Sequence, residues 1–154
     1  MTRGEIIEAL KGYFDIKDLV CQHTWKNWGE KSWQFLSTEY LHTLLIVRRD
    51  ILKSAMTCNN WSAGGSFSQR GLRCNICQIV IDKTKSFQSY LSAHVTGNGG
   101  DFDVKGMSAE AARLRIQSMS APLLYQIRLE ADVNWLHFDV YDSGSGEEVT
   151  VFKS

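Results

Sequence analysis

The hydrophobic pattern of the chain changes its period near Met56, and this change restricts the fold more than any other feature of the sequence. Before Met56, apolar residues recur at the spacing of one helix face. After it, several segments alternate apolar and polar residues, as half-buried strands do. Helices followed by strands, with few β-α-β units between them, predict an α+β fold whose N-terminal third is helical.

Capping residues and periodicity place the expected elements along the chain. Thr2 and Glu5 form a capping-box pattern, and Ser108 suits the cap of a later helix. The expected helices cover residues 6–14, 15–28, 30–55, 76–91 and 108–119. The expected strands cover residues 55–61, 99–106, 125–142 and 147–152, with SGSG at 143–146 as the turn between the last two.

Length and charge narrow the class of protein. The 154 residues suffice for a hydrophobic core, and we expect residues 1–154 to form one domain. With 17 basic and 17 acidic residues the net charge is zero, which argues against a nucleic-acid-binding surface. No apolar run is long enough to span a membrane. Charged residues interrupt the N-terminus where a secretory signal would be apolar, so we expect a protein that is cytoplasmic as synthesised.

Four cysteines are present, Cys21, Cys58, Cys74 and Cys77. The last two form a lone C-x-x-C, and a structural zinc site needs a second pair of ligands at suitable spacing. Neither of the other cysteines supplies such a pair, and His23, two residues after Cys21, is expected to be a surface or packing residue. A thioredoxin-like redox role lacks the surrounding β-α-β pattern. The pattern therefore predicts small, buried, reduced cysteines.

The segment SAHVTGNGGDFDV, residues 92–104, carries His94 and Asp101 on either side of Gly97, Gly99 and Gly100. Imidazole nitrogens and carboxylate oxygens are ordinary zinc ligands. Two residues seven apart cannot share one face of a regular strand, because an odd offset puts them on opposite faces. The glycines permit a bend and a close approach of the backbone. The segment therefore predicts a loop folded so that both side chains meet one metal ion.

A third ligand is available in NWLHFDV. A catalytic zinc takes three protein ligands and leaves the fourth place to water. His137 lies within an alternating segment, and its neighbours on the same strand face are Trp135 and Asp139. The residues alone leave two interpretations open, a ligand set of His94, Asp101 and His137, or a histidine satisfied within a core.

SAHVTGNGGD also resembles the pattern S-x-H-x-x-G-x-(Ala/Gly)-x-D of a family of zinc peptidases. That family includes D-alanyl-D-alanine carboxypeptidases and dipeptidases and phage L-alanyl-D-glutamate endopeptidases. Its small α+β fold is shared with the signalling domain of Hedgehog. The resemblance implies a small, mainly antiparallel sheet with flanking helices, and a zinc cofactor. NNWSAGGSFSQRGLR is most similar to phage and prophage members, and the resemblance covers roughly residues 56–142.

Individual positions carry over from this resemblance. The histidine and aspartate of the pattern are zinc ligands in the family and correspond to His94 and Asp101. The third ligand is a histidine in a Trp-x-His context on a late strand, which corresponds to His137 in WLHFD. The arginine of a GYR or GLR motif lies near the substrate, which implies such a place for Arg73 in RGLRCN.

The chain departs from the family at the general base. Many members carry a glutamate three residues before the third ligand, where this chain has Asn134, whose neutral amide cannot accept the proton. Asp139, Glu130 and Asp132 are substitutes, and we favour Asp139 and then Glu130. Asp139 has another interpretation, in which it hydrogen-bonds a ligand imidazole and fixes its tautomer. Glu130 has one as a solvated strand residue.

The resemblance implies a zinc metallopeptidase that hydrolyses peptidoglycan stem peptides, as a carboxypeptidase or as an endolysin released to the cell wall by phage lysis. Arg73 is expected to hold a substrate carboxylate. Trp135 is expected either to line the substrate groove or to pack in the core. The alternative is a zinc-bearing binding or structural module of the same fold without catalysis, which Asn134 favours. The bond that is cut and the oligomeric state stay open.

Overall fold

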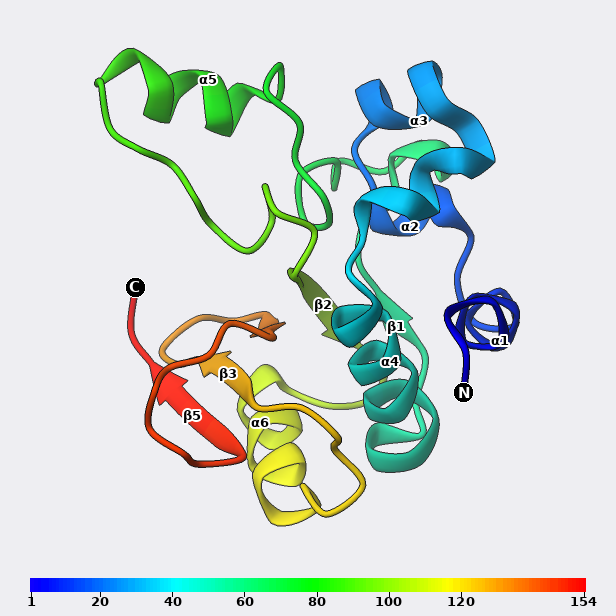
Figure 1. The fold of residues 1–154 in the computed structure, drawn as a ribbon, viewed down its shortest axis with the longest axis vertical. Helices are drawn as coiled ribbons and strands as arrows, with labels where there is room; N and C mark the ends of the chain where they lie inside the picture. The colour runs from blue at the N-terminus through cyan, green and yellow to red at the C-terminus, as the bar shows by residue number, and fades with distance from the viewer.

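The computed structural model describes residues 1–154, in which a helical N-terminal part precedes a five-stranded mixed sheet (Figure 1). The predicted α+β class with a helical first third is therefore confirmed. The α-helices are α1 (Arg3–Leu10), α2 (Ile16–Leu19), α3 (Gln22–Trp28), α4 (Thr38–Ile46), α5 (Gln78–Lys85) and α6 (Ala109–Ser118). The 3₁₀ helices are η1 (Gly29–Phe35) and η3 (Trp61–Ala63), and η2 (Val47–Leu52) is a π-helical continuation of α4.

The helix expected over 76–91 ends at Lys85 and that expected over 6–14 ends at Leu10, and two other expected helices are interrupted. The helix expected over 15–28 is interrupted at Val20, whose backbone is extended and forms a parallel bridge with Leu72. The helix expected over 30–55 is interrupted at Ser37, which caps α4 by accepting a hydrogen bond from the backbone N–H of Tyr40 at 3.2 Å. In both places another partner competes with continued helix, a distant backbone segment at Val20 and the Ser37 side chain before α4, and apolar periodicity registers neither.

The strands are β1 (Met56–Thr57), β2 (Gly99–Val104), β3 (Ile127–Glu130), β4 (Leu136–Asp139) and β5 (Val149–Phe152), in the spatial order β1-β2-β4-β3-β5. All neighbours are antiparallel except β3 and β5, which are parallel. The single strand expected over 125–142 is wrong, because residues 131–135 turn the chain between β3 and β4. Residues 143–146 do bend the chain, with Gly144 and Gly146 at positive φ, but they do not join neighbouring strands, since β5 pairs with β3 and not with β4.

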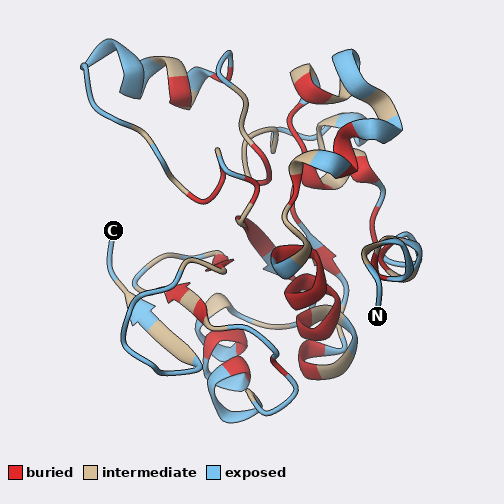
Figure 2. Cartoon of the chain, in the orientation of Figure 1, coloured by how far each residue is buried: buried red, intermediate tan, exposed pale blue.

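The sheet has one apolar face and one polar face. Phe102 of β2 and Phe138 of β4 stack at 5.3 Å between ring centroids, and Tyr40 of α4 packs against Phe138. Helix α6 packs against β2 and β4, and its Ala112 and Ile116 belong to the same buried core as the two phenylalanines. Because side chains alternate along a strand, Asp101 and His137 project to the opposite face. Figure 2 shows the buried residues concentrated along α4 and β2.

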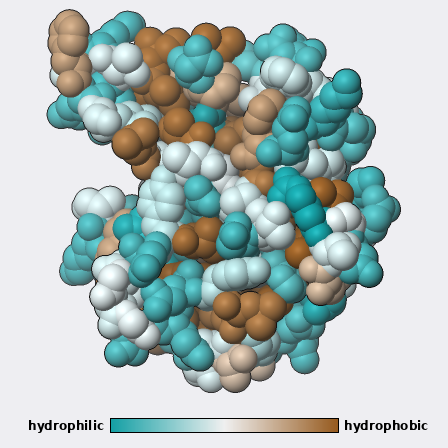
Figure 3. All heavy atoms as spheres, in the orientation of Figure 1, coloured by the Kyte–Doolittle hydropathy of each residue, from teal (hydrophilic) through white to brown (hydrophobic).

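Helix α5 stands apart from the main core, which contains 28 buried residues. The buried cluster beside α5 contains only Cys21, Cys77 and Val80. Figure 3 shows an indentation in the outline of the molecule between the part that carries α5 and the part that carries β5. None of the helices combines the length and the hydropathy that crossing a bilayer requires.

Candidate metal centre

Strand register sets two of the predicted ligands side by side. Asp101 of β2 is the direct partner of His137 of β4, and Gly99 is the partner of Asp139. Directly opposed residues on one sheet face have neighbouring Cβ atoms, so their side chains interact. The apolar residues Phe102 and Phe138 pack on the core side, which fixes the register and directs Asp101 and His137 outward.

His94 lies in the turn that precedes β2. The expected bend between His94 and Asp101 is present, and the backbone N–H of Asn98 donates to the carbonyl of Ala93 at 2.8 Å to close it. Gly97 has a φ of 71°, and a Cβ there would lie 1.9 Å from the carbonyl oxygen of Phe35. A side chain at this position would therefore force the turn and the end of η1 apart.

The three predicted ligands converge. One ligand atom from each of His94, Asp101 and His137 lies within 4.8 Å of the other two, and all three residues are buried. His137 Nδ1 lies 2.7 Å from Asp101 Oδ1, and His94 Nε2 lies 3.3 Å from Asp101 Oδ2. The carboxylate thus stands between the two imidazoles, where one ion can contact all three.

Both imidazoles are oriented by their second nitrogen. His94 Nδ1 lies 2.9 Å from the carbonyl oxygen of Gly71, to which it can only donate. Its Nε2 is then left as an acceptor that faces Asp101. His137 Nε2 lies 2.9 Å from Asp139 Oδ2. Donation from Nε2 leaves Nδ1 of His137 free to ligate a metal, and such outer partners commonly fix a metal-binding tautomer.

The ionisation of the cluster reflects these contacts in the metal-free protein. Burial alone would raise the pKa of Asp101, but hydrogen bonds and charge from His137 and His94 outweigh it and hold that pKa well below its usual range. Burial alone would lower the pKa of His137, but Asp101 and Asp139 outweigh it and raise that pKa to about 9. In the metal-free protein these carboxylates therefore hold a proton on His137, which a bound metal ion would displace.

Asp139 is placed to orient other groups. Its side chain is buried and accepts from Arg128 Nε and Nη2, both at 2.9 Å, from His137 Nε2 at 2.9 Å, and from the backbone N–H of Tyr141 at 3.0 Å. A carboxylate has about four acceptor sites, so these bonds leave none directed at the pocket. The geometry favours the orienting interpretation of Asp139 over a role as general base.

A pocket of about 290 Å³ opens over the cluster and is lined by Arg73, Tyr90, Glu130, Trp135 and Phe152 among others. Arg73 Nε donates to the carbonyl of Gln69 at 2.6 Å, and Nη1 donates to the hydroxyl of Tyr90 at 2.7 Å. Its Nη2 has only a loose contact of 3.6 Å with Asp101 Oδ2. Arg73 is therefore anchored with one nitrogen still available to a ligand.

The other two carboxylates suggested as general bases, and Asn134, lie in different places. Glu130 is half-buried and lines the pocket. Asp132 lies in the connection between β3 and β4 and pairs with Lys153 at 2.7 Å. Asn134 is exposed in the same connection and lines a different hollow, beside β2 and α6. Among the residues suggested as bases, Glu130 is the one that lines the pocket and whose carboxylate makes no hydrogen bond or ion pair within the protein.

Two arginines of this region were not anticipated from the sequence. Arg128 binds Asp139, and the alternation of QIRLE puts it on the same strand face as Glu130, so the signal was present. Arg113 of α6 is buried and donates to the carbonyls of Glu130, Val133 and Trp135 at 3.1–3.2 Å. It fixes the β3–β4 connection, and no local sequence pattern indicates that contact.

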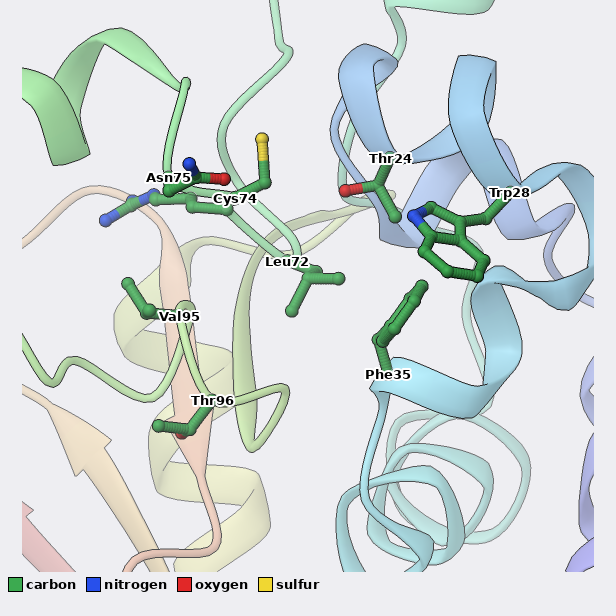
Figure 4. A pocket seen from close by; sticks show the side chains of 9 residues that line it. Thr24, Trp28, Phe35, Leu72, Cys74, Asn75, Val95 and Thr96 are labelled. Atoms are coloured by element: carbon green, nitrogen blue, oxygen red, sulfur yellow. The ribbon is translucent and has the colours of Figure 1, made fainter.

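A second group of metal-ligand side chains lies outside this pocket. Cys21, His23, Cys74 and Cys77 offer ligand atoms that all lie within 4.8 Å of one another. The expectation that the C-x-x-C pair has no partner ligands is therefore wrong. All four cysteines of the chain are free thiols, and Cys58 is buried elsewhere in the main core. Cys74 also borders a pocket of about 320 Å³ between α3 and the 95–96 turn, with its sulfur directed away from Leu72 (Figure 4).

Comparison with known proteins found no family model, no curated protein and no solved structure that matches this chain.

Proposed function

We propose that this protein is a zinc metallopeptidase that hydrolyses peptide bonds in peptidoglycan stem peptides, with the fold of the D-alanyl-D-alanine peptidases and the Hedgehog signalling domain. The convergence of His94, Asp101 and His137 within 4.8 Å carries the proposal. Two imidazoles and one carboxylate form a three-ligand set of the kind that catalytic zinc sites use, with the fourth position open.

The donor chemistry fits zinc. Each imidazole has its second nitrogen bound to an oxygen, Gly71 O for His94 and Asp139 Oδ2 for His137, and this outer shell is typical of zinc-binding histidines. Asp101 presents both carboxylate oxygens to the cluster. When bound, zinc lowers the pKa of a coordinated water towards about 7 and polarises a carbonyl oxygen.

The pocket supplies groups suited to a small peptide that carries carboxylates. Arg73 Nη2 makes only a 3.6 Å contact with Asp101 at the pocket wall, where a guanidinium can hold a substrate carboxylate in a charge-assisted pair. Stem peptides offer such a group at the D-alanine terminus and at the D-glutamate residue. Phe152 and Trp135 provide apolar surface for the peptide backbone and methyl groups.

Glu130 is assigned as the general base. It lines the pocket on the same strand face as Arg128, and its carboxylate can take a proton from water and return it to the leaving amine. Asp139, which accepts from Arg128, orients the His137 imidazole through Nε2. Asn134 faces away from the pocket, so its neutral amide does not weigh against catalysis.

The test is cleavage of defined muropeptides by the zinc-loaded protein, read by mass spectrometry. The expected result is cleavage that a chelator abolishes and added zinc restores, and the fragment masses identify the bond. The matched control is His42→Ala, a buried histidine of α4 outside the pocket, which should cleave normally. Absence of cleavage of every stem peptide by protein that holds zinc in the pocket would contradict the proposal and favour a binding module without catalysis.

A further inference from the structure

We propose that Cys21, His23, Cys74 and Cys77 form a second zinc site, structural in kind, that fastens α3 and α5 to each other. The four residues come from two places far apart in the chain, the start of α3 and the turn that precedes α5. Three thiolates and one imidazole are a soft donor set, and Cys₃His is an established ligand set for structural zinc. This site is independent of the proposed peptidase activity.

The distances among three of the donor atoms are those of a tetrahedral zinc site, and Cys21 Sγ lies within 4.8 Å of the other three. With Zn–S near 2.3 Å and Zn–N near 2.0–2.1 Å, tetrahedral geometry puts sulfurs about 3.8 Å apart and a sulfur and a nitrogen about 3.5 Å apart. Here Cys74 Sγ and Cys77 Sγ lie 3.9 Å apart, and His23 Nδ1 lies 3.6 Å from Cys74 Sγ and 3.7 Å from Cys77 Sγ. One ion can therefore contact these donors without movement of the chain.

Backbone pairing brings the two ligand pairs together. The backbone N–H of Cys21 donates to the carbonyl of Leu72 at 3.0 Å, and the N–H of Leu72 donates to the carbonyl of Leu19 at 2.9 Å. A Cβ at Gly71 would lie 2.1 Å from the Leu19 carbonyl oxygen, so glycine is required for this approach. The pairing is long-range, which explains why ligand spacing in the sequence does not show it.

Two of the cysteine side chains lack the capping role that their positions would allow. Cys21 and Cys77 each occupy the residue before a helix, yet neither makes a side-chain capping bond. Both are buried, and the hydroxyl of Thr24 lies 3.1 Å from Cys21 Sγ, where it can donate to a thiolate. The 3.9 Å between Cys74 and Cys77 sulfurs far exceeds the length of a disulfide bond, about 2.05 Å.

The segment around α5 has less hydrophobic burial to hold it in place than the main core has. Besides the two cysteines, Val80 is the only buried residue of the apolar cluster beside α5. Ile76, within the C-x-x-C turn, is half exposed. A cluster this small contributes little hydrophobic free energy, and small structural units of this kind often depend on a bound metal.

The test uses cobalt(II) as the spectroscopic probe in the full-length protein under reducing conditions. The double variant His94→Ala/His137→Ala removes the pocket ligands, so that the thiolate cluster alone is observed. We expect this variant to bind one cobalt per chain, with intense sulfur-to-cobalt charge-transfer absorption and the strong visible bands of tetrahedral cobalt. Zinc should displace the cobalt, and far-ultraviolet circular dichroism should show folded protein throughout.

Further substitutions in the same background locate the ligands. Cys74→Ser, at the least buried of the three cysteines, should lower the intensity of the charge-transfer band because one sulfur ligand is lost, and His23→Gln should weaken the affinity for cobalt. Cys58→Ala, which removes the one cysteine outside the cluster, should leave it unchanged. A folded double variant that shows no thiolate–cobalt band would overturn the proposal. So would a band intensity and a cobalt affinity that neither Cys74→Ser nor His23→Gln changes, or a Cys74–Cys77 disulfide in the protein as purified without oxidant.

Discussion

The two ligand clusters of this protein differ in how they are built. His94, Asp101 and His137 lie on the polar face of the sheet, where strand pairing fixes two of them and a glycine turn supplies the third. The four residues of the other cluster lie between helix ends, joined by one long-range backbone bridge. One cluster rests on the 28-residue core, and the other adjoins a buried apolar cluster of three.

The two clusters suit different tasks. Three hard and borderline donors under an open pocket leave a coordination position for substrate or water, whereas four donors close a tetrahedral site. The rigid sheet can hold its ligands without metal, because a hydrogen-bond network already orients them. The loop cluster has little else to hold it. We therefore expect metal to act on chemistry at the first cluster and on stability at the second.

Removal of a pocket ligand should have the largest effect on hydrolysis, and it tests whether the pocket metal serves the chemistry. His137→Ala should reduce hydrolysis to the background rate and lower the zinc content from two per chain to one, because the remaining two ligands no longer make a catalytic site. Zinc content is measured by elemental analysis beside the muropeptide assay. Retention of two zinc ions and of activity by this variant would break the assignment of the pocket.

Removing the base should separate chemistry from metal binding. Glu130→Gln should keep both zinc ions and lower the hydrolysis rate by roughly 10²–10⁴-fold, since a neutral amide cannot take the proton. Initial rates at saturating zinc and substrate check this. Glu147→Gln, in the exposed turn before β5, is the matched control. Turnover near normal in Glu130→Gln would move the role of base to another group.

Substitution of Asp139 should have an effect of intermediate size, on zinc affinity rather than on the chemical step. If it orients His137, Asp139→Asn should weaken zinc binding at the pocket by about 10–100-fold while kcat at saturating zinc stays within a few fold. Competition with a chromophoric chelator measures the affinity. A large loss of kcat with unchanged zinc affinity would instead identify Asp139 as the base.

The smallest expected effect concerns pH and the metal-free protein. Asp101 and Asp139 raise the pKa of His137 to about 9, so its contribution to stability is fully present below its unfolded pKa and is lost as the pH rises through about 9. The midpoint of thermal unfolding should therefore fall more between about pH 7 and pH 10 in the metal-free protein than in metal-free His137→Gln, at about 2–4 °C per kcal/mol. Parallel pH profiles for the two would contradict this role of His137.

The sequence predicted those features of the fold that depend on residues close together in the chain. The α+β class, the caps at Thr2 and Ser108, strand β2 and the bend after His94 follow from periodicity, capping and glycine placement. The ligand set of His94, Asp101 and His137 also came from the sequence, and the structure brings these three side chains together. Its identity as a zinc site stays a prediction.

The features that the sequence did not predict depend on contacts between segments far apart in the chain. The bridge between Val20 and Leu72 interrupts an expected helix and at the same time assembles the cysteine cluster. The parallel pairing of β5 with β3 depends on a crossover that strand periodicity does not encode. The hydrogen bonds of Arg113 to the β3–β4 connection likewise join elements that are separated in the chain.

Stepwise return of zinc to the metal-free, reduced protein tests the two-cluster account most directly. Muropeptide hydrolysis and protein stability are followed together as zinc is added. Soft thiolates bind zinc strongly, so the first equivalent should raise the thermal stability with little hydrolysis, and hydrolysis should rise across the second equivalent and then level off. Full hydrolysis after one equivalent, or none after two, would contradict the account.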